Sequence, residues 1–173
     1  MTVQLNEAVQ LLARTPQALE QLLVGLSDEW LTCNEGEGTW NATEVVEHLL
    51  VAERTNWIPR LEWLMKEGEG RAFPPFDRFA HLQQRRDDSM ECKLREFRQL
   101  REASLARLHT IINFESDLDR TGRHPQLGIV KASELLATWV VHDLTHTSQI
   151  TRVLANRYRS EVGPWVQYLS ILR

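Results

Sequence analysis

The sequence predicts an all-α protein, a four-helix bundle. Apolar residues recur at three- and four-residue steps in four long segments, as they do on one face of an α-helix, and strand-like alternation is almost absent. Long connections join these segments, which is typical of a bundle. Since no repeat, low-complexity stretch or linker divides the chain, we expect one domain over residues 1–173.

The first two helices carry distinct local signals. An apolar stripe begins at Leu5, and Thr15-Pro16 is expected to break the helix and restart it, because proline is tolerated at a first helical position. The second helix should start at Asn41, with Glu44 completing a capping box. It should run to about Lys66, with a kink at Pro59, which cannot donate a backbone hydrogen bond.

The second half of the chain is predicted to hold the other two helices. Amphipathic periodicity predicts one helix from Asp87-Asp88 to about Asn113 and another over Ala132–Tyr158. The segment 114–130 is rich in Asp, Gly and Pro and is expected to be a loop. The apolar tail Trp165–Leu172 is expected to pack back onto the bundle.

Charge and composition exclude several classes of function. The net charge of −4 provides no broad cationic field for nucleic acid or anionic lipid. No run of about 18 apolar residues could span a membrane, and the N-terminus lacks the pattern of a secretory signal. Cys33 and Cys92 are isolated cysteines, which suits a reduced, soluble cytoplasmic protein.

The most informative pattern is a histidine pair in the last predicted helix. His142 and His146 are four residues apart, so their rings project from one helical face, about 6 Å apart along the axis. That face is predicted to be the inner one. Two buried imidazoles repel each other when charged and leave lone pairs unsatisfied when neutral. A divalent cation resolves both problems.

His48 is the candidate for a third ligand, because it lies on the inward stripe of the second helix. Three histidines on two helices would leave at least one coordination position open, as a reactive site requires. The alternative is that these are hydrogen-bonded core histidines with no metal between them.

Asp143 and the other histidines receive different interpretations. Asp143 occupies the place of the glutamate in His-Glu-x-x-His proteases, but it points away from the two histidines, so we favour an outer-shell or surface role. His124 is interpreted as structural. His81 and His109 are predicted to be exposed.

The sequence resembles the DinB/YfiT-like superfamily over nearly the whole chain. The matching pieces are Gly38–Asn41, Glu44–Leu49, Gly122–Pro125, Leu127-Gly128, Leu135-Leu136, Trp139, His142-Asp143, His146, Gln149-Ile150 and Val162–Trp165. The resemblance implies a four-helix bundle, commonly a homodimer, with zinc, nickel or another divalent ion at His48, His142 and His146. Lys131 departs from the Ser or Thr usual in the family and predicts a looser helix start.

The leading hypothesis is a metal-dependent enzyme that acts on a small electrophilic substrate. The resemblance implies either a hydrolase or an enzyme of the thiol S-transferase or isomerase type that uses a low-molecular-weight thiol. No catalytic residue beyond the three ligands can be identified from the sequence. The alternatives are a non-catalytic bundle that binds a small molecule or metal, and a bundle with core histidines alone.

Overall fold

The computed structural model describes residues 5–83 and 86–173, with the Leu5 side chain excepted. The predictions that fall on residues 1–4 and 84–85 lie outside the described residues. The elements in chain order are α1 (Leu5–Leu23), α2 (Asp28–Leu31), α3 (Ala42–Thr55), α4 (Trp57–Glu67), α5 (Ala80–Gln83), α6 (Met90–Ile111), β1 (Thr121–His124), β2 (Gly128–Lys131), α7 (Ala132–Asn156) and two short 3₁₀ helices, η1 (Gly163–Tyr168) and η2 (Ser170–Leu172).

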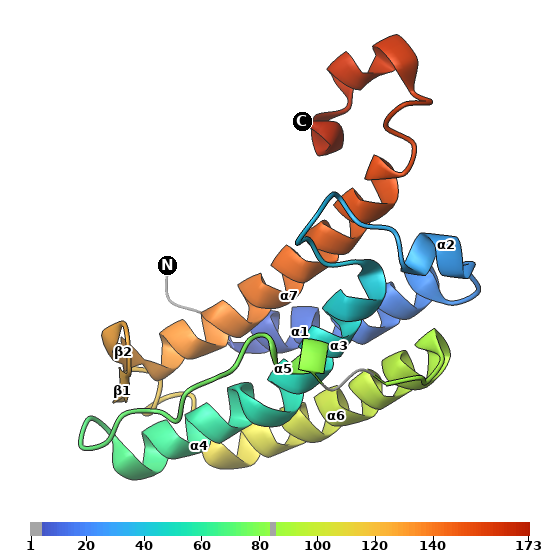
Figure 1. Cartoon of the computed structure of the whole chain (residues 1–173). Coiled ribbons are helices and arrows are strands. Elements are labelled where there is room, and N and C mark those ends of the chain that lie inside the picture. Colours follow the sequence, from blue (N-terminus) through green and yellow to red (C-terminus); the bar gives the residue numbers. More distant parts are fainter. Residues whose placement is uncertain (1–4, 84–85) are drawn as a thin grey trace.

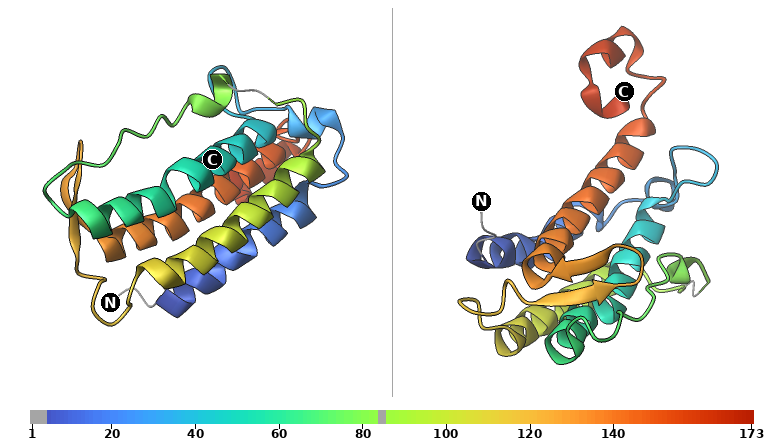
Figure 2. Two further views of the ribbon diagram at one scale, coloured as in Figure 1. Left: turned by 90° about the horizontal axis from the view of Figure 1, so that it is seen from below. Right: turned by 90° about the vertical axis from the view of Figure 1, so that its left-hand side faces the viewer.

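Four long helical arms form the bundle, which confirms the predicted fold class. One arm is α1, another is α3 followed by α4, and the remaining two are α6 and α7 (Figure 1). Both α1 and the α3–α4 arm pack against α6 and α7. The two further views show the arms side by side, with the β1–β2 hairpin across one end (Figure 2).

The expected break at Thr15-Pro16 was wrong, because α1 continues through Pro16. A proline inside a helix removes the hydrogen bond to the carbonyl four residues earlier. Here that carbonyl belongs to Leu12, and it accepts a 2.7 Å hydrogen bond from Nη1 of Arg101 on α6. Since a charged donor replaces the missing amide, the helix tolerates the proline.

The second predicted helix is divided into two at Asn56. Its start agrees with the prediction: Asn41 Oδ1 accepts from the Glu44 amide at 2.9 Å, and the Glu44 carboxylate accepts from the Asn41 amide at 3.0 Å. The interruption falls three residues before Pro59. In a continuous helix the amide of residue 59 would donate to the Thr55 carbonyl, but proline has no N–H and its ring would clash with that carbonyl, so the helix breaks there.

The helix α7 starts at Ala132 without a capping side chain on Lys131. The Glu134 carboxylate accepts from the Lys131 amide at 2.8 Å, and the Ala132 amide donates to the Arg120 carbonyl at 2.9 Å. The Lys131 ammonium instead pairs with Asp119 at 2.7 Å. Glu134 in the first turn of α7 and the Arg120 carbonyl of the preceding loop therefore accept hydrogen bonds at the helix start that the lysine side chain leaves uncapped.

The segment predicted as a loop contains an antiparallel hairpin. Thr121 pairs with Lys131, and His124 pairs with Gly128. A side chain at Gly122 would lie 2.9 Å from Cγ of Leu64, so the hairpin approaches α4 too closely for any other residue. The prediction missed these strands because each has only four residues and packs through one close backbone contact.

The core consists of two apolar clusters with a charged group between them. Along α6 and α7, Arg101 and Asp143 separate the clusters, and both side chains are buried. The cluster near the hairpin includes Leu12, Trp57, Leu61, Leu64, Leu108, Leu136 and Trp139. The other includes Leu19, Leu23, Val45, Leu49, Leu94, Phe97 and Ile150.

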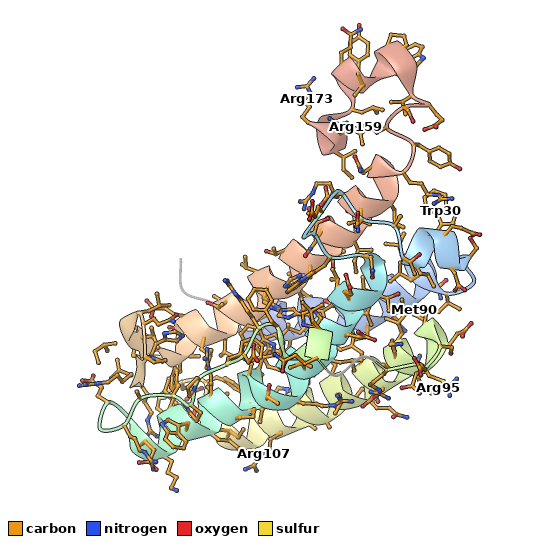
Figure 3. The ribbon with its side chains drawn as sticks, viewed as in Figure 1. Trp30, Met90, Arg95, Arg107, Arg159 and Arg173 are labelled. Carbon is orange, nitrogen blue, oxygen red and sulfur yellow. The ribbon has the colours of Figure 1, made fainter. Side chains whose placement is uncertain are left out.

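The C-terminal tail projects beyond the bundle at the end of α7 (Figure 1). Its last turn, η2, returns to α7, with Leu172 buried and its carbonyl accepting from Arg159 at 2.5 Å (Figure 3). The predicted packing is thus confined to the end of one helix. Among the described helices, none has the length and apolar character needed to cross a membrane.

Candidate metal centre

The structure brings His48, His142 and His146 together. His48 lies in the second turn of α3, held in register by the capped start of that helix, and His142 and His146 lie one turn apart on α7. One ring nitrogen from each of the three lies within 4.8 Å of the others. His48 is buried, and the other two are partly buried.

The hydrogen bonds around the cluster orient the rings. His48 Nδ1 donates to the Arg78 carbonyl at 3.1 Å, and His146 Nδ1 donates to Oε1 of Gln149 at 2.9 Å. In each ring the proton on Nδ1 leaves the Nε2 lone pair available. Nε2 of His142 lies 3.1 Å from Nε2 of His48.

Burial keeps these imidazoles neutral. Desolvation lowers the pKa of His48 and of His142 to about 3, and neighbouring imidazoles contribute to both shifts. Desolvation also lowers the pKa of His146, against the opposing effect of Gln149. At neutral pH all three are therefore in the form that binds metal.

The residues fit a divalent cation. A neutral His142 has one ring proton. If Nδ1 carries it, two lone pairs face each other across 3.1 Å between His142 and His48. If Nε2 carries it, the buried Nδ1 is an acceptor without a partner in the described part of the chain. A cation that accepts the Nε2 lone pairs removes the first conflict, and three imidazoles suit zinc or nickel.

Two tryptophans enclose the cluster. The Trp40 ring centroid lies 4.9 Å from that of His48 and stacks on His146 at 6.1 Å, with an interplanar angle of 17°. Trp57 contacts His142 edge-on at 5.0 Å. These rings limit the access of water to two sides of the site.

His81 is a neighbour that the sequence analysis missed, because it was predicted to be exposed. It is buried on α5, with its ring centroid 4.4 Å from that of Trp40 and 5.3 Å from that of His48. The apolar residues near it, Phe79 and Leu82, are themselves exposed, so the local sequence carried no signal for the burial of His81. His109, in contrast, is exposed as predicted.

Asp143 faces the charged group of the core. Its two carboxylate oxygens accept from Nη1 and Nη2 of Arg101 at 2.6 and 3.2 Å. Arg101 also pairs with Glu53, at 3.0 and 2.9 Å. The side chain of Asp143 is buried and makes no hydrogen bond to a histidine among the described residues, although it follows His142 directly.

A cavity of about 440 Å³ lies beside the three histidines. Its wall combines aromatic and apolar side chains with a few charged ones, a composition common in small-molecule sites. One side is formed by α4 and α7, and the hairpin contributes His124, Leu127 and Val130. The two cysteines lie elsewhere: Cys33 is partly buried and Cys92 exposed.

The comparison with protein families decides where the chain belongs. The model of the DinB superfamily matches residues 11–150, which include all three histidines and most of the bundle. The chain belongs to the DinB superfamily. This confirms the resemblance inferred from the sequence. Among curated proteins, none matches the chain.

Two solved structures share the DinB fold of this chain. One is YfiT from Bacillus subtilis, which is described as a probable metal-dependent hydrolase with an unusual four-helix bundle topology. Its sequence is 24% identical to this chain, and the TM-score is 0.72 for a match that covers 86% of this chain and 84% of YfiT. TT2238, described as a four-helix bundle protein, is 21% identical, with a TM-score of 0.57 over 86% of this chain and 98% of its own. At these identities the likeness shows the fold.

Proposed function

We propose that this protein is a divalent-metal-dependent enzyme that acts on a small electrophilic substrate. His48, His142 and His146 hold the ion in this proposal. The observation that carries it is the convergence of three neutral imidazoles beside a cavity of about 440 Å³. The description of YfiT as a probable metal-dependent hydrolase supports the same class of activity.

Each part of the site has a role in this proposal. A bound divalent ion supplies Lewis-acid chemistry, which lowers the pKa of a water or thiol and polarises an electrophile. Three protein ligands leave a coordination position open. The Nδ1 hydrogen bonds of His48 and His146 hold the rings in place, and Trp40 shields one side from solvent. The cavity receives the substrate.

The nucleophile distinguishes two versions of the reaction. With water, the protein is a hydrolase, the activity attributed to YfiT. With a low-molecular-weight thiol, it is a thiol S-transferase or isomerase, which the DinB resemblance supports. Both versions use the same three ligands, and zinc or nickel fits either.

One observation favours a second candidate, a non-catalytic binding protein for a small molecule or metal. Glu134 is the carboxylate on the described cavity wall, and its Oε2 already accepts from the Lys131 amide. The described cavity wall therefore offers no carboxylate free of a structural hydrogen bond to act as a general base, which a binding protein does not need.

Metal content and turnover test these proposals in sequence. Protein purified without a histidine tag is analysed for metals, and we expect about one zinc or nickel per chain. The loaded and stripped proteins are then assayed with esters, amides and alkylating electrophiles, with water alone and with a panel of thiols. Metal binding without turnover on any pair of nucleophile and electrophile would favour the binding protein. A chain that binds no metal would exclude the enzyme and leave, of the second candidate, only a binding protein for a small molecule.

Replacing one ligand tests the assignment directly. In His146→Ala, we expect both zinc binding and turnover to be lost, because two remaining histidines hold zinc poorly. His109→Ala is the matched control, since His109 is exposed on α6, away from the cluster. Equilibrium dialysis against zinc measures both variants. Undiminished zinc binding by His146→Ala would exclude the proposed ligand set.

A further inference from the structure

The wall of the cavity beside the histidines contains an arginine, Arg60, that has no ion-pair partner among the described residues. Arg60 on α4 is partly buried, and its guanidinium carbon lies 5.5 Å from the ring centroid of Phe73 and 6.0 Å from that of Phe76. All three side chains line the cavity. The two rings hold the guanidinium in place through cation–π contacts.

No described carboxylate forms an ion pair with Arg60, and no described group accepts a hydrogen bond from its side chain. Burial lowers its pKa, and no anion opposes that shift. The contrast with Arg101 is informative, because two carboxylates neutralise that buried cation. A partly desolvated cation without an anionic partner is costly. This arrangement is explained if a ligand supplies the anion.

The groups around Arg60 also suit an anion. Asn56 lies one turn before Arg60 on the same helical face; it is buried, lines the cavity, and its Oδ1 has no partner in the described residues. An amide turned over about its last bond presents N–H donors instead. His124 on β1 lines the same cavity as Arg60, and its pKa is lowered by burial and then by the charge of Arg60.

We infer that Arg60 is a specificity-determining residue, which binds the carboxylate of a small organic acid whose apolar part lies against the aromatic wall. Arg60 and the three histidines line the same cavity, so one ligand can contact Arg60 with its carboxylate and extend towards the histidines. Of the two arginines that line the cavity, Arg78 is exposed and Arg60 is partly buried among aromatic rings. One partly buried arginine suits a monoanionic carboxylate better than a phosphate dianion, whose desolvation requires more partners.

The position of the reacting group relies on the proposed function, but binding at Arg60 does not. The test therefore uses metal-free, full-length protein, in which a carboxylate cannot bind to an ion. The probes are 4-phenylbutyrate and its neutral analogue 4-phenylbutyramide, titrated by calorimetry. We expect the carboxylate to bind about tenfold or more tightly than the amide, as charge-assisted hydrogen bonds imply.

Variants assign the effect to one residue. Arg60→Met keeps the apolar bulk over Phe73 and Phe76, so we expect it to remove the preference for carboxylate and leave amide binding unchanged. Arg71→Met is the matched control, because Arg71 also stacks on a ring, that of Trp63 at 4.9 Å, outside the cavity wall. Unchanged amide binding shows that the variant is folded.

Several results would overturn the inference. They are equal binding of the two probes by the wild type, no binding of either at millimolar concentration, and a loss that affects both probes equally in Arg60→Met. If the preference for the carboxylate probe were lost in Arg78→Met and kept in Arg60→Met, the anion would bind at Arg78, the exposed arginine of the cavity wall, instead. Failure of metal binding would leave these outcomes unaffected, so the two proposals can fail separately.

Discussion

At the scale of single residues, the buried charge of Arg101 links its own helix, α6, to three other helices. Its guanidinium is 1% exposed and bonds Glu53 on α3, Asp143 on α7 and the Leu12 carbonyl on α1. Burial raises the pKa of Glu53, whereas the charge of Arg101 opposes that shift. Hydrogen bonds and ion pairs among Arg101, Glu53 and Asp143 therefore satisfy nearly all the polar atoms that burial of these three side chains removes from water.

Removing this cation should destabilise the bundle strongly. Arg101→Ala leaves two buried carboxylates without a partner, so we expect a loss of about 3–5 kcal/mol in the free energy of unfolding. Arg107 lies on the same helix as Arg101 and makes an exposed ion pair with Glu62 of α4. Arg107→Ala should therefore cost about 1 kcal/mol or less. Urea unfolding measures both, and similar small losses would contradict the role given to Arg101.

Asp143→Asn tests whether this carboxylate supports the proposed metal ligands. Asp143 is buried beside His142 and fixed by Arg101, and we propose that it positions the α7 ligands from outside the metal shell. We then expect zinc affinity or activity to fall about 10–100-fold. Zinc titration and reaction rates at saturating zinc separate the possible roles of Asp143. Full zinc occupancy with collapsed turnover would indicate a general base. Full occupancy with full activity would show that Asp143 does not support the metal ligands.

At the scale of elements, the start of α3 determines where His48 lies. The reciprocal hydrogen bonds of Asn41 and Glu44 hold the first turn, and His48 follows about two turns later. A helix whose first turn frays would place His48 less well.

Asn41→Ala should therefore lower stability by ~1 kcal/mol and weaken zinc binding. Thermal unfolding and zinc titration measure the two effects. Asn41→Asp, which keeps an accepting oxygen at the same place, is the control and should retain both properties. Unchanged stability in the alanine variant would show that the cap contributes little.

At the scale of the whole molecule, several exposed apolar side chains lie together in sequence on the tail after α7. Trp165, Tyr168, Leu169 and Ile171 are exposed on η1 and η2, beyond the bundle. Exposed apolar clusters often mark contacts between proteins. We propose that the protein is a homodimer, in line with the DinB resemblance.

Light scattering at micromolar concentration should give a mass of about 40 kDa, twice that of the 20.1 kDa chain, for a two-fold symmetric pair. The double variant Trp165→Ser, Tyr168→Ser tests whether the tail makes the contact and should then be monomeric. A wild-type mass of about 20 kDa would exclude the dimer, and a dimeric variant would place the contact elsewhere.

The sequence alone determined the features that depend on neighbours along the chain. Helical periodicity predicted the four arms, and the Asn41–Glu44 spacing predicted the start of α3, because side chains three and four residues apart meet on a helix. The same geometry placed His142 and His146 on one face. The place of His48 on the inward stripe followed from periodicity as well.

The tertiary structure decided what depends on residues distant in the sequence. The continuity of α1 through Pro16 requires Arg101, 89 residues beyond Leu12. The burial of His81 depends on Trp40, and the hairpin depends on a close contact of Gly122 with α4. Sequence patterns report local periodicity, whereas these features arise from packing between separate elements. The approach of His48 to His142 also arises from packing between separate elements. These residues are 94 apart in sequence, and the 3.1 Å between their Nε2 atoms is what makes a metal site possible.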